Sequence, residues 1–376
     1  MRIAVAMSGG VDSSAAALLL ARQGAEVVGL SMHLWGGGDG REEGRCCTLE
    51  DLSTARRAAE RIGIPHYVLN LEERFREAVV RPFAESYLAG ETPIPCQACN
   101  TDLKFDALLE RAQALGCESV ATGHYARTEV DGGSGEVLLL KGRDASRDQS
   151  YFLWGLSAEQ LRRARFPVGD LRKADVRGIA REAGLPNWDK PDSQEVCFLR
   201  AGERPADFIL REAGSLGIRL PALDGDVVDR RGAPLGRHAG VIGFTVGQRR
   251  GLGVAGGEPL YVVGIDAGSS RVVVGGEADL LSREVLLSGL RFVAPSAPPA
   301  ELRVLARVRS RHGEQQAWLG PTEGCLRNGG PARLFFDEPV RAAAPGQAAV
   351  FYDPGRPERV LGGGVIRRSP AGAPGP

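Results

Sequence analysis

The stretch that decides the fold is Ser8-Gly9-Gly10-Val11-Asp12-Ser13-Ser14, near the start of this 376-residue chain. It follows residues 2–7, an apolar run that predicts a buried strand, and it precedes residues 14–23, which predict an alanine- and leucine-rich helix. A glycine pair between a strand and a helix lets backbone N–H groups approach a ligand closely, and the helix N-terminus adds partial positive charge. The heptapeptide therefore indicates a phosphate-binding turn.

This turn lacks the Gly-Lys-Ser/Thr ending of a Walker A loop. It resembles the PP-loop, Ser-Gly-Gly-x-Asp-Ser, of enzymes that split ATP between its α and β phosphates and bind the pyrophosphate. An ordinary strand–turn–helix corner with serine caps is the alternative, but the complete heptapeptide at a strand–helix junction favours the nucleotide site. Asp12 would position magnesium or the pyrophosphate, or else serve only as a carboxylate at the start of a helix.

Composition describes a globular protein of two or three domains, with 43% hydrophobic and 25% charged residues. No apolar run spans a bilayer and no signal peptide is present, so we expect a cytoplasmic protein without a membrane partner. The formal net charge is zero, so an RNA-binding surface would have to be a local patch. Seven cysteines in such a chain favour reduced thiols, catalysis or metal binding over a disulfide scaffold.

The first half alternates predicted strands with predicted helices. The strands are residues 27–31, 66–70 and 119–122, and the helices are residues 49–62, 73–90 and 105–116. In the first of these helices, one face is expected to carry Leu49, Leu52, Ala55, Ala59 and Ile62. The alternation predicts a parallel sheet that binds ligands at the carboxyl ends of its strands.

Beyond about residue 205 the helical pattern weakens. Short β-like runs occupy residues 226–228, 241–245, 260–265 and 271–274, and the chain from residue 285 onward is also rich in strand and turn signals. We expect an α/β domain over residues 1–205, a small β-rich domain over 206–282 and a C-terminal β-barrel over 283–368. Residues 369–376 are Pro, Gly and Ala for the most part and predict a disordered tail.

Cys96 and Cys99 form a C-x-x-C pair next to two prolines, which predict an ordered loop and not a helix. Asn100 and Thr101 can cap a helix that begins near Asp102, and a position near a helix N-terminus would lower the pKa of the Cys99 thiol.

The third cysteine of interest is Cys197, which we expect on a strand at a sheet edge, after a Pro-Asp-Ser turn. A lone C-x-x-C could also be a redox pair, half of a zinc site or incidental. A second C-x-x-C is missing, and the five histidines show no ligand spacing. The remaining cysteines, taken as structural or unassigned, are Cys46, Cys47, Cys117 and Cys325.

Together these segments resemble the bacterial tRNA-specific 2-thiouridylase family, from Met1 to about Arg368. The motifs that carry the resemblance are residues 6–13, 122–127 (Thr-Gly-His-Tyr-Ala-Arg), 148–153 (Asp-Gln-Ser-Tyr-Phe-Leu), the Cys197 segment and 247–253 (Gly-Gln-Arg-Arg-Gly-Leu-Gly). The resemblance implies a Rossmann-like, adenine nucleotide alpha hydrolase-like domain followed by two β-rich domains. It also implies use of ATP and Mg²⁺ to replace the 2-oxygen of the wobble uridine of lysine, glutamate and glutamine tRNAs by sulfur.

The resemblance further assigns roles to residues. Nucleotide contacts would come from Ala6, Met7, Ser8, Gly9, Gly10, Val11, Asp12, Ser13, Met32 and Gly123. Cys197 would take sulfur as a persulfide from a donor protein, either a cysteine desulfurase or a sulfur relay protein. Cys99 would be the nucleophile that releases this sulfur, leaving a Cys99–Cys197 disulfide to be reduced.

The RNA contacts implied by the resemblance fall in two groups. Beside the flipped target base would lie Ile94, Pro95 and Cys96, and further contacts would come from His124, Arg147, Asp148, Gln149, Arg311, His312 and Gln347. Residues 307–312 also predict a basic strand that places Arg307, Arg309 and Arg311 on one face, where they track phosphates or form a solvated surface.

One position departs from the family pattern. Cys96 stands where most members have an aspartate thought to serve in proton transfer. The alternative reading is a [4Fe–4S] cluster held by Cys96, Cys99 and Cys197, as in related RNA-thiolating PP-loop enzymes. Two rivals remain: a PP-loop ligase that adenylates a small molecule, disfavoured by the cysteines and the β-rich half, and a non-catalytic RNA-binding or sulfur-carrier protein, disfavoured by the intact PP-loop.

Overall fold

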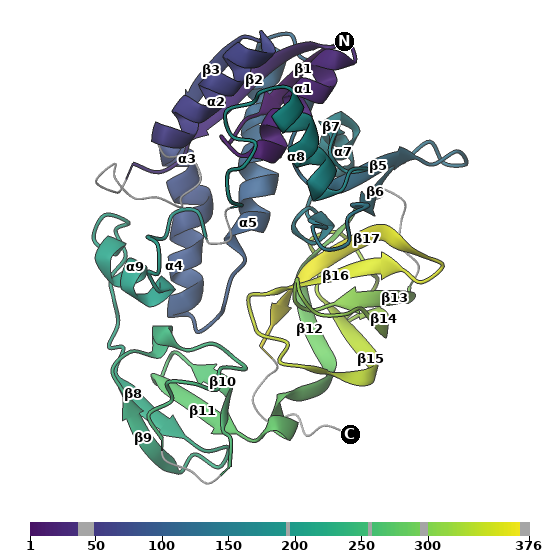
Figure 1. Cartoon of the computed structure of the whole chain (residues 1–376). Coiled ribbons are helices and arrows are strands. Elements are labelled where there is room, and N and C mark those ends of the chain that lie inside the picture. Colours follow the sequence, from purple (N-terminus) through teal and green to yellow (C-terminus); the bar gives the residue numbers. More distant parts are fainter. Residues whose placement is uncertain (37–48, 193–195, 255–257, 294–299, 369–376) are drawn as a thin grey trace.

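The computed structural model describes residues 1–36, 49–192, 196–254, 258–293 and 300–368. Cys46, Cys47 and the predicted tail lie outside these ranges. The chain forms an α/β body that includes the N-terminus, a small β domain and a barrel that includes the last strand (Figure 1). Among the described residues, no helix is both long and apolar enough to cross a membrane.

The α/β body is built on five parallel strands in the order β3-β2-β1-β4-β7, as the alternating pattern predicted. These strands are β1 (Arg2–Ala6), β2 (Glu26–His33), β3 (His66–Asn70), β4 (Ser119–Ala121) and β7 (Ala164–Arg165). The sheet has apolar side chains on both faces because helices cover both. Ile3 and Val5 join the core of one face, while Ala4 belongs to the core of the other.

One face of the sheet is covered by α1 (Val11–Arg22), α2 (Leu49–Ile62) and α8 (Lys173–Glu182). Helix α1 begins three residues earlier than the sequence indicated. The bounds predicted for α2 are confirmed, but its expected face is partly wrong, because Leu49 is exposed while Asp51 and Thr54 are buried. The small side chains Ala55, Ala58 and Ala59 allow α2 to approach the sheet closely.

The other face is covered by two long helical stretches. They consist of α3 (Glu72–Phe75), η1 (Arg76–Val80) and α4 (Arg81–Leu88), and of α5 (Pro95–Ala98), η2 (Cys99–Ala107) and α6 (Leu108–Ala114). The predicted loop around the C-x-x-C pair is therefore wrong. Pro95 occupies the first turn of α5, where its missing N–H costs nothing, so the proline starts a helix there. Cys99 lies inside the helical stretch, which removes the argument that a helix N-terminus activates its thiol.

Cys197 also differs from expectation. It lies in a turn and not on a strand at a sheet edge. The turn packs against the apolar core beneath the second face of the sheet, where Phe198 is fully buried. The remaining helical segments of this body are η3 (Ser150–Phe152), α7 (Ala158–Arg163) and α9 (Pro205–Glu212).

The small domain contains a four-stranded sheet in the order β10-β11-β8-β9. Its strands are β8 (Gly225–Val228), β9 (Pro234–His238), β10 (Tyr261–Asp266) and β11 (Arg271–Gly275), accompanied by η4 (Val241–Gly243) and η5 (Glu277–Leu280). Residues 241–243, expected as part of a strand, form the 3₁₀ turn η4.

The C-terminal domain is a closed barrel of six strands, as predicted, in the order β12-β15-β14-β13-β16-β17 with β12 pairing back onto β17. The strands are β12 (Leu281–Phe292), β13 (Leu302–Arg307), β14 (Gln315–Pro321), β15 (Ala332–Arg341), β16 (Ala348–Asp353) and β17 (Arg356–Arg367). The predicted basic strand is wrong in part, because β13 ends at Arg307, and Arg309 and Arg311 lie in the turn that follows.

A hairpin of β5 (Ala126–Val130) and β6 (Val137–Lys141) extends from the α/β body onto the barrel, and the sequence did not reveal it. Its strand β6 pairs with β17, with Leu139 opposite Val360 (Figure 1). Leu139 is fully buried in an apolar cluster that also contains Trp154 and Tyr352. The two domains therefore share one sheet and one core.

We expect Leu139→Ala to lower the free energy of unfolding by about 2–5 kcal/mol, because it leaves a cavity in this shared core. Val130→Ala, on the same hairpin but 65% exposed, should change it by no more than about 0.5 kcal/mol. The shift of the urea midpoint and the rate of proteolysis between the two domains measure both variants. Equal effects of the two substitutions would contradict a shared core.

Candidate functional site

A cavity of about 960 Å³ lies at the carboxyl ends of β1 and β4, where the order of the sheet changes direction. Most of the residues predicted from the sequence meet there. Those that line it are Ala6, Met7, Ser8, Gly10, Val11, Asp12, Ser13, Met32, Gly123, His124, Arg147, Asp148, Gln149, Arg311 and His312.

The turn between β1 and α1 presents backbone N–H groups to this cavity. Gly10 is the N-cap of α1 and has no side chain with which to bond the first-turn amides. Ser13 folds back instead, donating to the Gly10 carbonyl over 3.0 Å and accepting from the Ser8 amide over 3.2 Å. The side-chain amide of the buried Asn187 also donates to the Gly9 carbonyl over 2.9 Å. These bonds hold the turn in place and leave the first-turn amides of α1 without a capping side chain, available to a ligand.

Two glycines are required here by close backbone approach. Gly9 has φ +77°, and an added Cβ would lie 2.4 Å from the carbonyl oxygen of Asp51. Gly123, two residues after the end of β4, faces the first turn of α1, where an added Cβ would lie 2.6 Å from the amide nitrogen of Ser13. Any side chain at residue 123 would push the strand end away from the helix.

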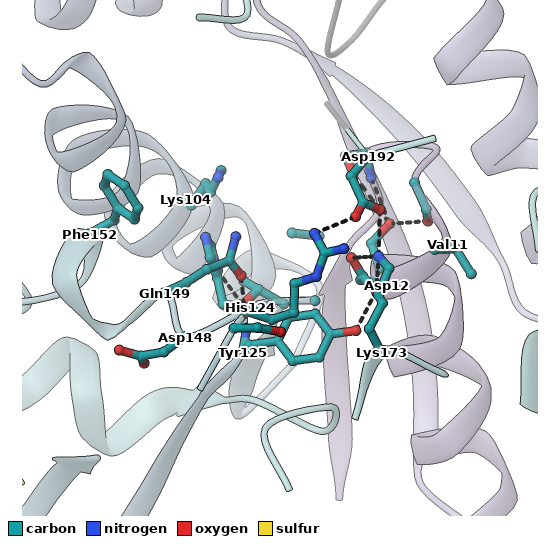
Figure 2. Close-up of a pocket in the computed structure, with 18 of the residues that line it drawn as sticks. Val11, Asp12, Lys104, His124, Tyr125, Asp148, Gln149, Phe152, Lys173 and Asp192 are labelled. Atoms are coloured by element: carbon teal, nitrogen blue, oxygen red, sulfur yellow. Dashed lines mark hydrogen bonds and ion pairs between the residues drawn. The ribbon is translucent and has the colours of Figure 1, made fainter. Parts of the chain in front are cut away.

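One wall of the cavity holds a compact group of charges (Figure 2). The Lys173 ammonium contacts both carboxylate oxygens of Asp12, at 2.7 and 2.8 Å, and also Asp192 at 2.6 Å. The Tyr125 hydroxyl donates to Asp12 over 2.8 Å. Lys173 is nearly buried, so water screens its charge little, and the charge acts strongly on groups in the cavity beside the glycine turn.

Further cations complete this wall. Arg147 contacts Asp192 at 2.8 Å, and Lys190 is paired with the buried Asp51. Burial opposes ionisation of Asp192, but the hydrogen bond and charge of Lys173, aided by Arg147, hold the pKa of that carboxyl below its usual value. Asp192 is therefore a charged counter-ion at neutral pH, and an anion entering the cavity would compete with it for Lys173 and Arg147.

The opposite wall is formed by Lys104, Gln149 and Phe152, with His124 at its base (Figure 2). The Gln149 side chain accepts from the Tyr125 amide over 2.9 Å, and His124 Nδ1 lies 2.8 Å from the Thr122 hydroxyl. Burial, and after it the charge of Lys104, set the pKa of His124 well below its usual value, so its imidazole is neutral. An aromatic ring, an amide and a cation on one wall suit a planar polar group.

A partly buried ion network joins this site to the barrel. Glu314 accepts from Lys141 of β6 over 2.6 Å and from Arg307 at the end of β13. Arg307 also lies 3.9 Å from Asp148, which in turn accepts from the Gly142 amide over 3.1 Å. Asp148 thus organises residues 142–150 and is not simply a free ligand contact. The network fixes the barrel turn that carries Arg311 and His312 at the mouth of the cavity.

A second hollow, of about 340 Å³, shares Ser310, Arg311 and His312 with the first. Gln347 lines it and donates to the Thr92 carbonyl over 2.7 Å. Arg309 also lines it, but its guanidinium is engaged with the carbonyls of Val246 and Ala342 at 3.0 and 3.1 Å. Arg309 therefore holds the small domain to the barrel, which corrects the expectation that it lies beside Arg307 and Arg311 on one strand face.

Six predicted residues line neither hollow. One is Gly9, which packs against the backbone of Asp51. Ile94, Pro95 and Cys96 begin α5 or directly precede it, with Cys96 exposed. Cys99 is buried in the core beneath the sheet, and Cys197 is half-buried against the same core. Within the described ranges, no three His, Cys, Asp or Glu side chains come together as a metal site. The arrangement therefore does not present the three cysteines as cluster ligands.

Sequence reasoning assigned no site role to several residues that the site uses, among them Lys104, Lys173, Asn187 and Lys190. Each is far along the chain from the glycine turn. A lysine at a helix start, as at Lys173, has many ordinary explanations, so a single sequence gave no signal for it. Lys190 precedes Asp192 by two residues, in a segment where only the cysteine had a recognisable chemical role.

A parallel α/β sheet with an open glycine turn at its switch point, followed by two β domains, defines a nucleotide-binding enzyme of the PP-loop class. Three protein-family models match the chain. They are the tRNA methyl transferase HUP domain over residues 1–201, the tRNA methyl transferase PRC-barrel domain over 215–276 and the aminomethyltransferase beta-barrel domain over 282–366.

The tRNA-specific 2-thiouridylase of Solibacter usitatus is 46% identical over 376 residues, covering 97% of this chain and 98% of that protein. That of Acidobacterium capsulatum is 46% identical over 374 residues, with the same coverage. The chain belongs to the tRNA-specific 2-thiouridylase family, whose members are transferases. Among solved structures, a complex of a 4-thiouridine synthetase with RNA and ATP aligns with 57% of this chain and 51% of its own at 15% identity, with a TM-score of 0.34.

The depressed pKa of His124 makes stability depend on pH. The unfolded chain takes up a proton at this residue near pH 6.5, while the folded chain does not. Stability is therefore lost as the pH falls below about 6.5, by at most about 1.4 kcal/mol per pH unit. We expect His124→Gln, which cannot titrate, to lose less stability than the wild type between pH 7.5 and 5.5. Urea unfolding at both pH values measures this, and equal losses would contradict a buried neutral imidazole.

Proposed function

We propose that this enzyme binds ATP in the larger cavity and uses it to activate the 2-oxygen of the wobble uridine in lysine, glutamate and glutamine tRNAs for replacement by sulfur. The observation that carries the proposal is the division of the cavity into two unlike walls. Lys173, Arg147 and Lys190 line the cavity and are paired with Asp192 and Asp51 beside the glycine turn. Phe152 and Gln149 lie opposite Lys173 (Figure 2). The first wall suits the triphosphate of ATP, and the second wall suits the uracil base of the target uridine.

In this proposal the β and γ phosphates lie on the glycine turn and displace Asp192 from its cations. Asp12 stays between Lys173 and Tyr125, so its part is to orient the lysine. The carboxylates of the cavity are already neutralised by lysines, and the described residues hold no preformed metal group. Magnesium would therefore enter with the nucleotide, bound chiefly by phosphate oxygens and water, with Asp12 the nearest carboxylate of the turn.

The uridine 2-oxygen attacks the α-phosphorus, the bond to pyrophosphate breaks, and pyrophosphate leaves with the electron pair while the base loses its N3 proton. The 2-oxygen of a uracil is otherwise a poor leaving group, and linkage to AMP makes it a good one. The neutral His124 at the floor of the cavity can take part in hydrogen bonding without adding a charge.

Sulfur would then arrive as a persulfide on Cys197. Its terminal sulfur bonds to C2 of the uracil, and AMP departs with the 2-oxygen. The Cys99 thiolate attacks the Cys197 sulfur, which breaks the S–S bond to the base and leaves a disulfide that an external dithiol reduces. Because neither thiol lines the cavity, the Cys197 turn and the start of η2, which carries Cys99, must approach the bound base for this step. The sulfur would come from a donor protein.

Two alternatives differ in what they require. Cluster-dependent thiolation would need Cys96, Cys99 and Cys197 together, which the described arrangement does not offer, so no step is drawn through a cluster. A methyltransferase, as the descriptions of the family models suggest, would have no use for a pyrophosphate-binding turn. Nucleoside analysis separates these readings, because it distinguishes 2-thiouridine from a methylated uridine.

The decisive experiment incubates the full chain with unmodified tRNA, ATP, Mg²⁺ and a persulfide donor, a cysteine desulfurase supplied with cysteine, and analyses the nucleosides. We expect 2-thiouridine only when ATP is present. Lys173→Met should weaken ATP binding roughly 10- to 100-fold, because a charge-assisted contact contributes about 1.5–3 kcal/mol. Arg172→Met, an exposed neighbour outside the cavity, is the matched control and should bind ATP normally. Thiolation without ATP, or no thiolated nucleoside, would refute the proposal.

The cysteines are tested one at a time. Cys197→Ser should prevent persulfide formation yet still permit pyrophosphate release, because Cys197 acts after ATP. Cys99→Ser should hold the persulfide but stall its release. Cys96→Asp restores the usual residue of the family and should keep or increase activity. If protein purified without oxygen were brown, and if Cys96→Ala removed iron and activity together, the persulfide route would be wrong.

A further inference from the structure

The cavity has a cation, Lys104, whose position the binding of pyrophosphate does not explain. Lys173, Lys190 and Arg147 gather on the wall beside the glycine turn. Lys104 lies on the opposite wall, together with Phe152 and Gln149 (Figure 2). A phosphate bound on the turn is already served by the first group. Lys104 therefore faces the part of the cavity where the bound ATP would meet the target uracil.

The surroundings of Lys104 hold its ammonium in place. It donates to the side-chain oxygen of Asn100 over 3.0 Å, one helical turn earlier. Asn100 is buried and donates in turn to the Phe152 carbonyl over 2.9 Å, so the lysine and the aromatic wall form one unit. Its charge also acts on His124, whose pKa it helps to lower. A lysine supported in this way loses little further entropy when it binds a substrate.

The helix that presents Lys104 also carries the thiols. Cys96 lies in α5, and Cys99 and Lys104 both lie in η2. Lys104 is the member of this helical stretch that reaches the nucleotide cavity, while Cys99 is buried on the core side. The stretch therefore connects the place where AMP is attached with Cys99, the thiol that releases the sulfur in the proposed function.

We propose that Lys104 is a catalytic residue of sulfur transfer, whose ammonium binds the α-phosphate of the adenylated uridine and stabilises AMP as it departs. This inference rests on the proposed function. As sulfur bonds to C2, the C2–O2 bond breaks, and the oxygen leaves with its electron pair as part of AMP. The AMP phosphate thereby gains one negative charge. A fixed cation at that oxygen lowers the barrier of this step, because it needs no reorganisation when the charge develops.

The test separates adenylation from sulfur transfer by using ATP labelled at the α-phosphate, unmodified tRNA, and a persulfide donor (a cysteine desulfurase with cysteine) that is added or left out. Wild-type enzyme without the donor should place label on tRNA, and addition of the donor should release it as AMP. With Lys104→Met we expect pyrophosphate release within about threefold of wild type, but thiolation lower by about 100-fold. Labelled tRNA should therefore accumulate even when the donor is present.

Three further variants isolate the charge. Lys104→Gln keeps a donor for Asn100 without the charge and should behave like Lys104→Met, whereas Lys104→Arg should restore part of the thiolation rate. Arg111→Met, an exposed position on the following helix α6, should leave both steps unchanged. If wild-type enzyme never labels tRNA, the proposed function itself fails. If it does label tRNA, but both steps fall together in Lys104→Met or Lys104→Gln matches wild type, Lys104 has no catalytic role.

Discussion

The close approach of Gly123 to the first turn of α1 is the constraint on which the site depends. A Cβ at residue 123 would lie 2.6 Å from the Ser13 amide nitrogen, so only glycine lets the end of β4 meet the start of α1. That contact sets the width of the cavity at the switch point of the sheet. It also places the two residues that follow Gly123. His124 lies at the floor of the cavity, and Tyr125 reaches the carboxylate of Asp12. The amides of the glycine turn, the lysine wall and the aromatic wall are then arranged around a fixed centre.

The sequence was sufficient for whatever depends on neighbouring residues. The heptapeptide, the strand before it and the βα alternation predicted the parallel sheet, and the glycine turn predicted a nucleotide cavity at its carboxyl edge. Contacts between residues that lie far apart in the sequence were not predicted. Lys173 meets Asp12, and Lys141 meets Glu314, only because the chain folds back over more than a hundred residues. Periodicity in one sequence carries no record of such pairs.

The cysteine segments show how a correct rule can be misapplied. Proline excludes the interior of a helix, but Pro95 stands in the first turn of α5, where proline is favoured. The C-x-x-C pair consequently lies on a helical stretch and projects to different surroundings, with Cys96 exposed and Cys99 buried. The same error left Lys104 unassigned, because a loop that ends near Asp102 does not predict the direction in which the Lys104 side chain points. Recognising the helix start would have placed the thiols and the lysine on one rigid support.

The β5–β6 hairpin has a consequence for how the protein is made. Its partner β17 comes far later in the chain, so β6 leaves the ribosome long before the strand that completes it. Until then one row of backbone N–H and C=O groups on β6 has no strand to pair with, and a two-stranded hairpin is marginally stable alone. The α/β domain consequently depends on synthesis of the barrel to close its own surface. A chain cut short before the barrel would expose a ready template for association with other nascent chains.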